Sequence, residues 1–90
     1  MGILEIGQIV FSKQGRDKGL PFMILRLEAN YVYLVDGKLR KLASPKKKKL
    51  IHVAKTNTVD HAMATLIQTG SHILDSDIRK IIKLYRESEA

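Results

Sequence analysis

The spacing of apolar residues along this 90-residue chain changes near Thr56. Before this point, short runs rich in β-branched and aromatic residues alternate with turn signals, as in strands. After it, apolar residues recur three and four positions apart, as in amphipathic helices. A chain of this length makes one small domain. The sequence therefore predicts an α+β fold, with a sheet over residues 1–55 and helices over residues 56–90.

Three runs in the first part indicate strands, at residues 7–13, 22–28 and 31–36. Asn30 suits a tight hairpin between the second and third runs, and Asp36-Gly37 is a strong turn dipeptide because glycine accepts positive φ. We expect two further short strands, at residues 39–42 and 50–53. Short strands at this density favour a strongly bent antiparallel barrel, since closure hides the sheet edges.

Two apolar stripes in the second part predict two helices. Asn57 or Thr58 can cap the first helix and Asp75 or Ser76 the second, and Gly70 suits the end of the first. We expect a helical hairpin that packs on itself and on the barrel, with docking onto a partner as the alternative. The stripes consist of Val59, Ala62, Met63, Leu66 and Ile67, and of Ile78, Ile81, Ile82 and Tyr85.

The basic charge of the chain is concentrated in the strand-rich part. The formal net charge is +7 and the pI about 9.9. Residues 1–55 hold 12 basic and 4 acidic residues, whereas residues 56–90 hold 4 and 5. A small basic domain most often binds a polyanion, although a basic surface also serves solubility.

Other features of the composition narrow the class of protein. The chain has no cysteine, which excludes disulfides, zinc ribbons, thiol catalysis and iron–sulfur clusters. No apolar run is long enough to span a bilayer, and the first residues lack the basic region of a signal peptide. We therefore expect a cytoplasmic protein with no membrane partner.

Two basic segments are candidates for polyanion contact. Gly15 and Gly19 allow a sharp turn from which Arg16 and Lys18 project toward phosphates or bases. Residues 38–49 hold seven Lys and Arg residues and no acid. Ser44 and Pro45 suggest a loop there, whose mobile lysines would neutralise phosphates. The alternatives are ordinary solvated loops and, for the lysines, a nuclear-import signal.

The tyrosines and histidines are weaker indications of a binding or catalytic site. Tyr31 and Tyr33 alternate on one strand and could stack on unpaired bases, but we expect at least one ring to pack in the core. His52, His61 and His72 lack the partners of a metal site. We expect no enzyme activity, cofactor or small-molecule substrate, because no nucleophile–base pair is present.

The order of motifs in residues 6–53 resembles the KOW domain. The matching elements are Gly7-Gln8-Ile9-Val10, the Gly15 to Gly19 loop, an apolar strand through Ile24, and Leu34-Val35-Asp36-Gly37. The version in the archaeal and eukaryotic ribosomal protein "fourteen-e" is the most similar. The resemblance implies an SH3-like barrel, an RNA partner and the glycine-framed loop as a contact. The helical tail lies outside the motif, so we expect a standalone relative.

We therefore expect an RNA-binding protein that contacts ribosomal or other structured RNA, with ribosomal proteins as further partners. The alternatives are a protein-interaction module of a transcription or ribosome complex and a non-specific DNA binder. The loop glycines are Gly15, Gly19 and Gly37. The expected RNA-binding residues are Lys13, Arg16, Lys18, Lys38, Arg40, Lys41, Lys46, Lys47, Lys48 and Lys49.

Overall fold

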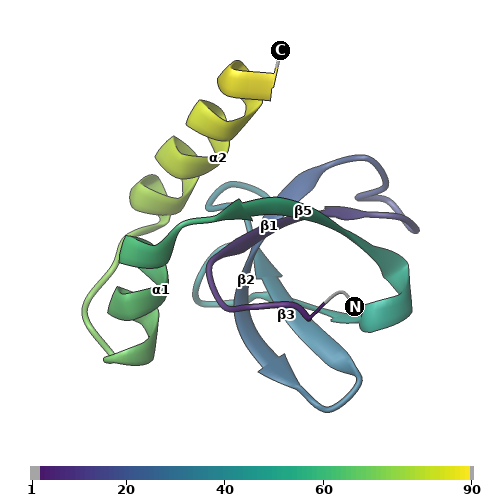
Figure 1. Cartoon of the computed structure of the whole chain (residues 1–90), viewed down its shortest axis with the longest axis horizontal. Coiled ribbons are helices and arrows are strands. Elements are labelled where there is room, and N and C mark those ends of the chain that lie inside the picture. Colours follow the sequence, from purple (N-terminus) through teal and green to yellow (C-terminus); the bar gives the residue numbers. More distant parts are fainter. Residues whose placement is uncertain (1–2, 90) are drawn as a thin grey trace.

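The computed structural model describes residues 3–89 and shows a five-stranded sheet followed by two helices (Figure 1). Every neighbouring pair of strands is antiparallel, in the order β4-β3-β2-β1-β5. This confirms the α+β class and the order of sheet before helices. The strands are β1 (Gln8–Ser12), β2 (Pro21–Glu28), β3 (Tyr31–Val35), β4 (Lys46–Lys49) and β5 (Val53–Val59). The helices are α1 (His61–Gln68) and α2 (Asp75–Glu89).

The first three strands and the hairpin at Asn30 are confirmed. Glu28 pairs with Tyr31 across a two-residue turn, in which Ala29 has a φ of 51°. The strand expected at residues 39–42 is wrong, because the segment turns back on itself. The Asp36 Oδ1 accepts hydrogen bonds from the backbone N–H groups of Lys38 and Arg40, and so stabilises the turn.

The last two strands lie elsewhere than expected. The lysine run is not a loop but the edge strand β4, in which Lys48 pairs with Val32. Leu50–His52 form a 3-10 turn instead of a strand. β5 then runs from Val53 to Val59, past the change in composition at Thr56. Both strands are polar because they form the sheet edges, where one side of each strand lacks a partner.

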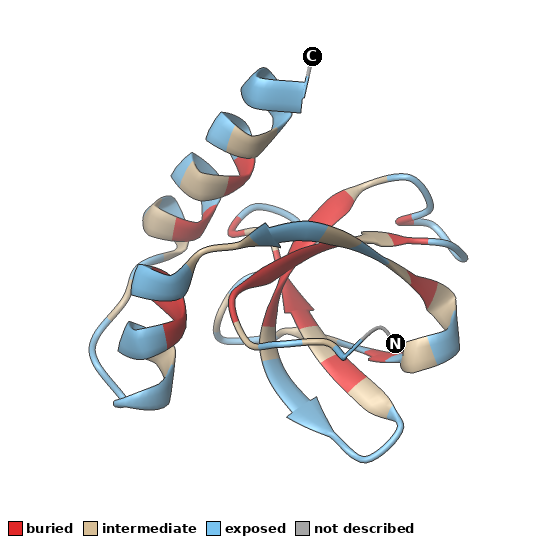
Figure 2. Ribbon diagram, viewed as in Figure 1, coloured by how far each residue is buried: buried red, intermediate tan, exposed pale blue. Residues whose placement is uncertain are grey.

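The sheet is bent around a first core on its inner face (Figure 2). β4 and β5 do not pair with each other within residues 3–89, so the structure shows an open, curved sheet and not a closed barrel. Alternate residues of the strands point inward, as the two-residue period requires. This core consists of Val10, Phe22, Ile24, Val32, Leu34 and Val53.

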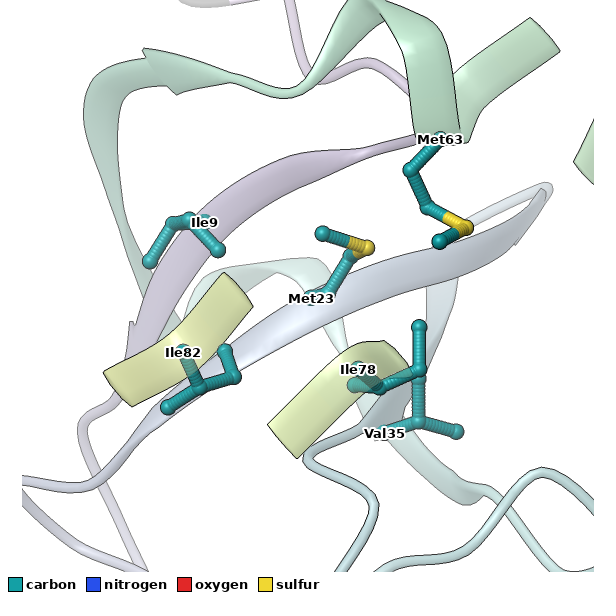
Figure 3. Close-up of a cluster of buried hydrophobic side chains, with 6 residues drawn as sticks. All are labelled: Ile9, Met23, Val35, Met63, Ile78 and Ile82. Carbon is teal, nitrogen blue, oxygen red and sulfur yellow. The ribbon is translucent and has the colours of Figure 1, made fainter. Parts of the chain in front are cut away.

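A second core lies between the outer face of the sheet and the helices (Figure 3). Side chains from β1, β2 and β3 point toward side chains from α1 and α2, so the helical part packs on the sheet. Phe11 of β1 also contacts the ring of Tyr85, with ring centroids 6.1 Å apart. The buried members of this core are Ile9, Met23, Val35, Met63, Ile78 and Ile82.

The helices pack on the sheet more than on each other. In Figure 1 they run in opposite directions, and most of α2 extends past the start of α1 and not alongside it. The cap expected at Asn57 or Thr58 is wrong, because β5 keeps both residues extended. Asp60 caps α1 instead, accepting a hydrogen bond of 2.9 Å from the Met63 N–H.

Gly37 fixes the position of α2 against the β3–β4 loop. Its φ is 77°, and a Cβ built there would collide with the Asp75 carbonyl and lie 3.0 Å from the Arg79 backbone nitrogen. The Arg79 guanidinium donates a hydrogen bond of 2.6 Å to the Gly37 carbonyl. The Asp75 carboxylate accepts another from the Leu42 N–H. Residues far apart in the sequence therefore join α2 to this loop.

Candidate nucleic-acid interface

The β1–β2 loop presents three basic side chains and turns one acid inward. Lys13, Arg16 and Lys18 are exposed, whereas Asp17 is buried with 6% of its surface exposed. Gly15 and Gly19 both have a φ of 84°, so the turn uses a backbone conformation that glycine adopts without strain. The loop is therefore a fixed turn from which the basic side chains project into solvent.

Arg40 joins the β3–β4 loop to the β1–β2 loop. Its Nη2 and Nε lie 3.0 Å and 3.2 Å from the Asp17 Oδ2. Because this guanidinium satisfies a buried carboxylate, Arg40 contributes to the structure, although its side chain is still 32% exposed. Lys38 and Lys41, from the same loop, are exposed.

The four lysines of β4 divide between the two faces of the sheet. Lys48 points to the inner side, is 9% exposed and donates a hydrogen bond of 2.8 Å to the Gln14 carbonyl. Lys46 is half-buried. Lys47 and Lys49 are exposed on the outer side, opposite Tyr33 and Tyr31 of β3. The lysine run is thus an ordered strand that offers two of its four charges to the outer face.

Cationic and tyrosine side chains alternate across the outer face of β2, β3 and β4. The Arg26 guanidinium lies 4.1 Å from the centre of the Tyr33 ring, and the Lys47 Nζ lies 4.4 Å from Tyr31 and 5.9 Å from Tyr33. We call Arg26, Tyr31, Tyr33 and Lys47 the tyrosine row. The cations are attracted to the negative faces of the rings, which holds these long side chains in place.

Both rings of the tyrosine row are half-buried and belong to neither core, so the expectation that one of them packs in the core is wrong. Val32 and Leu34, which alternate with the two tyrosines along β3, fill the inner core instead. Val35 is the β3 residue of the outer core. Tyr33 and Tyr31 lie on the same face of β3, farther along the strand than the part that the helices cover. Figure 2 shows that this end of the β2–β3 hairpin is exposed.

One acid accompanies the tyrosine row. The Glu28 Oε1 accepts a hydrogen bond of 3.0 Å from the Tyr33 hydroxyl, and the Glu28 Oε2 lies 3.9 Å from Arg26. Both partners of this ion pair are more than half exposed. Such a pair contributes little to stability and leaves Arg26 available to an incoming anion.

Arg26 was missed by the sequence analysis, although the hairpin register contains the signal. A two-residue turn at 29–30 pairs Glu28 with Tyr31, and the pairing continues outward to place Arg26 opposite Tyr33. Arg26 stands between Leu25 and Leu27, so its segment was interpreted only as an apolar strand.

A second basic region lies between α2 and the β3–β4 loop. Lys38 from the loop and Lys83 and Arg86 from α2 line a surface hollow of about 310 Å³. Asp36 and Arg79 also line it, but Asp36 is bonded to backbone N–H groups and Arg79 to the Gly37 carbonyl. This region therefore adds basic charge next to the candidate loops.

In residues 3–89 no group of three His, Asp or Glu side chains is placed to hold a metal ion. None of the helices in this range is long and apolar enough to cross a membrane. No protein-family model matches the chain, and no curated protein matches it either.

Proposed function

We propose that the protein is a small RNA-binding domain of the KOW type, whose RNA lies along the outer face of β2–β4 and the β1–β2 loop. The tyrosine row is the observation that carries this proposal. Cations alone would serve any polyanion, whereas half-exposed rings held among cations suit a ligand with both phosphates and flat bases.

The exposed basic side chains supply the attraction to phosphates in this proposal. Each phosphate that they neutralise releases condensed counterions, so affinity depends on salt. Arg40 and Lys48, which bond to Asp17 and Gln14, hold the loops in place instead. The proposed phosphate contacts are Lys13, Arg16, Lys18, Lys38, Lys41, Lys47 and Lys49.

The KOW assignment rests on the motif order together with the curved sheet. The loop at Gly15–Gly19 and the turn at Gly37 lie at strand ends of one bent antiparallel sheet, and the apolar strand through Ile24 is β2. We propose that this sheet corresponds to the SH3-like barrel that the resemblance implies. The ribosomal or other structured RNA that it implies is the proposed partner.

Paired charge-removing variants test the proposed surface. In Lys47→Gln/Lys49→Gln, two lysines of the outer face lose their charge. The control variant, Lys55→Gln/Lys80→Gln, also removes two positive charges, one from β5 and one from α2. Binding is measured by fluorescence anisotropy with an RNA hairpin that has an unpaired loop. We expect the first variant alone to weaken binding and to reduce the slope of log K against log salt by about 1.4. Equal loss in both variants would contradict the proposed face.

A protein-interaction module is the second candidate. A hollow between the end of β5 and α2 is lined mainly by apolar side chains, namely Val59, Ile81, Leu84 and Tyr85. A pull-down from cell lysate with and without ribonuclease distinguishes a protein-interaction module from an RNA-binding domain. Partners that remain after nuclease treatment favour this candidate, and partners that are lost favour RNA binding.

A further inference from the structure

The tyrosine row borders two surface hollows, and each hollow is lined by one of its rings. Tyr31 lines a hollow of about 510 Å³ together with Asn30, Lys49, Leu50 and Ile51. Tyr33 lines the other, of about 640 Å³. Pockets that hold small organic ligands span about 300 to 1,000 Å³, so either hollow admits a nucleobase.

Each hollow combines one tyrosine ring, one cation and several apolar side chains. The first combines the Tyr31 ring with the cation of Lys49 and the apolar side chains of Leu50 and Ile51. The second combines the Tyr33 ring with the cation of Arg26 and an apolar lining. Its remaining lining residues are Leu25, Leu42, Ser44, Pro45 and Ile67.

The spacing of the rings fits successive nucleotides of one strand. Tyr31 and Tyr33 are two residues apart on β3, which separates their Cα atoms by about 6.8 Å along the strand. Lys47 lies between the two rings, where the phosphate that links two bases would pass. A duplex could not use this arrangement, because its bases are stacked on each other and paired.

From this geometry we propose that the outer face binds unpaired RNA, with one base in the Tyr31 hollow and a neighbouring base in the Tyr33 hollow. The proposal rests on the function proposed above and specifies its ligand as single-stranded segments or loops. Lys47 and Lys49 bind the phosphates, and the Arg26 guanidinium stacks on Tyr33 or on the incoming base.

Intrinsic tyrosine fluorescence gives a direct test, because the chain contains three tyrosines and no tryptophan. In a Tyr85→Phe background the signal comes from Tyr31 and Tyr33 alone. Titration with an unstructured RNA octamer is expected to quench it, and the same octamer in a duplex is expected to bind less tightly. Absence of quenching on octamer binding would overturn the proposal.

Variants at Tyr31 then separate stacking from charge. Tyr31→Phe keeps the ring and is expected to bind the octamer as the wild type does. Tyr31→Leu keeps an apolar side chain without a ring and is expected to weaken binding roughly 5- to 150-fold, the value of one stacked base. Circular dichroism checks that both variants are folded.

The outcomes distinguish this inference from the proposed function. If the wild type binds octamer and duplex equally in low salt, and Tyr31→Leu has no effect, stacking is excluded while RNA binding stands. If the wild type binds neither RNA in low salt, the proposed function itself fails, and this inference fails with it.

Discussion

Asp17 is the acid in the middle of the proposed basic loop, and its burial decides how the loop is built. A carboxylate that is buried without a partner is costly, and Arg40 provides that partner across the gap between two loops. The same contact engages the Nε and Nη2 donors of Arg40. One ion pair therefore orders the loop that carries Arg16 and Lys18.

The ion pair gives a prediction for stability. We expect Arg40→Ala to lower the free energy of unfolding by about 2 kcal/mol, because it leaves the Asp17 carboxylate buried and unpaired. The loss is smaller than for a fully buried pair, since the Arg40 side chain is 32% exposed. Urea unfolding measures it. Arg16→Ala, an exposed control in the neighbouring loop, should change stability by less than about 0.5 kcal/mol.

Glu28 gives a prediction for affinity. Its carboxylate would repel phosphates near Arg26, and it also accepts a hydrogen bond from the Tyr33 hydroxyl. In Glu28→Gln the side chain loses its charge and keeps an oxygen acceptor, so we expect RNA to bind about two- to fivefold more tightly, as for an exposed charge pair. Anisotropy titration measures the change, and weaker binding would show that the carboxylate orders Arg26 for the ligand.

Among the elements, β4 shows best why sequence reasoning reached only part of the fold. Four consecutive lysines have no apolar alternation, so nothing local predicts a strand. The strand forms because β3 offers a free edge and because the stem of Lys48 can be buried while its Nζ reaches the Gln14 carbonyl. β5 was not predicted over its full length for the same reason, because its residues Lys55, Thr56, Asn57 and Thr58 are all polar.

The elements with strong local patterns were predicted. The apolar β2 and β3 and the stripe of α2 appear where their periods placed them. The turn at Gly15–Gly19 was also predicted from its glycines, whereas the lysine run was expected to be a loop and is β4. The tyrosine row was not assembled from the sequence, because it depends on cross-strand register between Arg26, Tyr33 and Lys47.

The contact between α2 and the β3–β4 loop gives a prediction with a matched control. Gly37 and Gly19 share nearly the same positive φ, but only Gly37 has other atoms in the space of a Cβ. We expect Gly19→Ala to cost about 1 kcal/mol for its backbone conformation. Gly37→Ala should cost at least about 2 kcal/mol more and loosen α2. Urea unfolding and amide hydrogen exchange of α2 measure both effects, and equal costs would contradict the close approach.

For the molecule as a whole, the helices and the sheet share one core and should unfold together. Ile78 of α2 is fully buried against Ile9, Met23 and Val35. We expect Ile78→Ala to lower the free energy of unfolding by about 2 to 5 kcal/mol. Far-ultraviolet circular dichroism should show a single transition that coincides with tyrosine fluorescence. A separate helix transition at lower urea would contradict a shared core.

The salt dependence of RNA binding tests the proposed function most directly. Anisotropy with a labelled single-stranded RNA is measured between about 50 and 200 mM KCl. If the seven proposed outer-face and loop cations each neutralise one phosphate, log K should fall against log salt with a slope of about −5, at about 0.7 per phosphate. No binding at the lowest salt, or a slope near zero, would contradict an RNA-binding surface built from these cations.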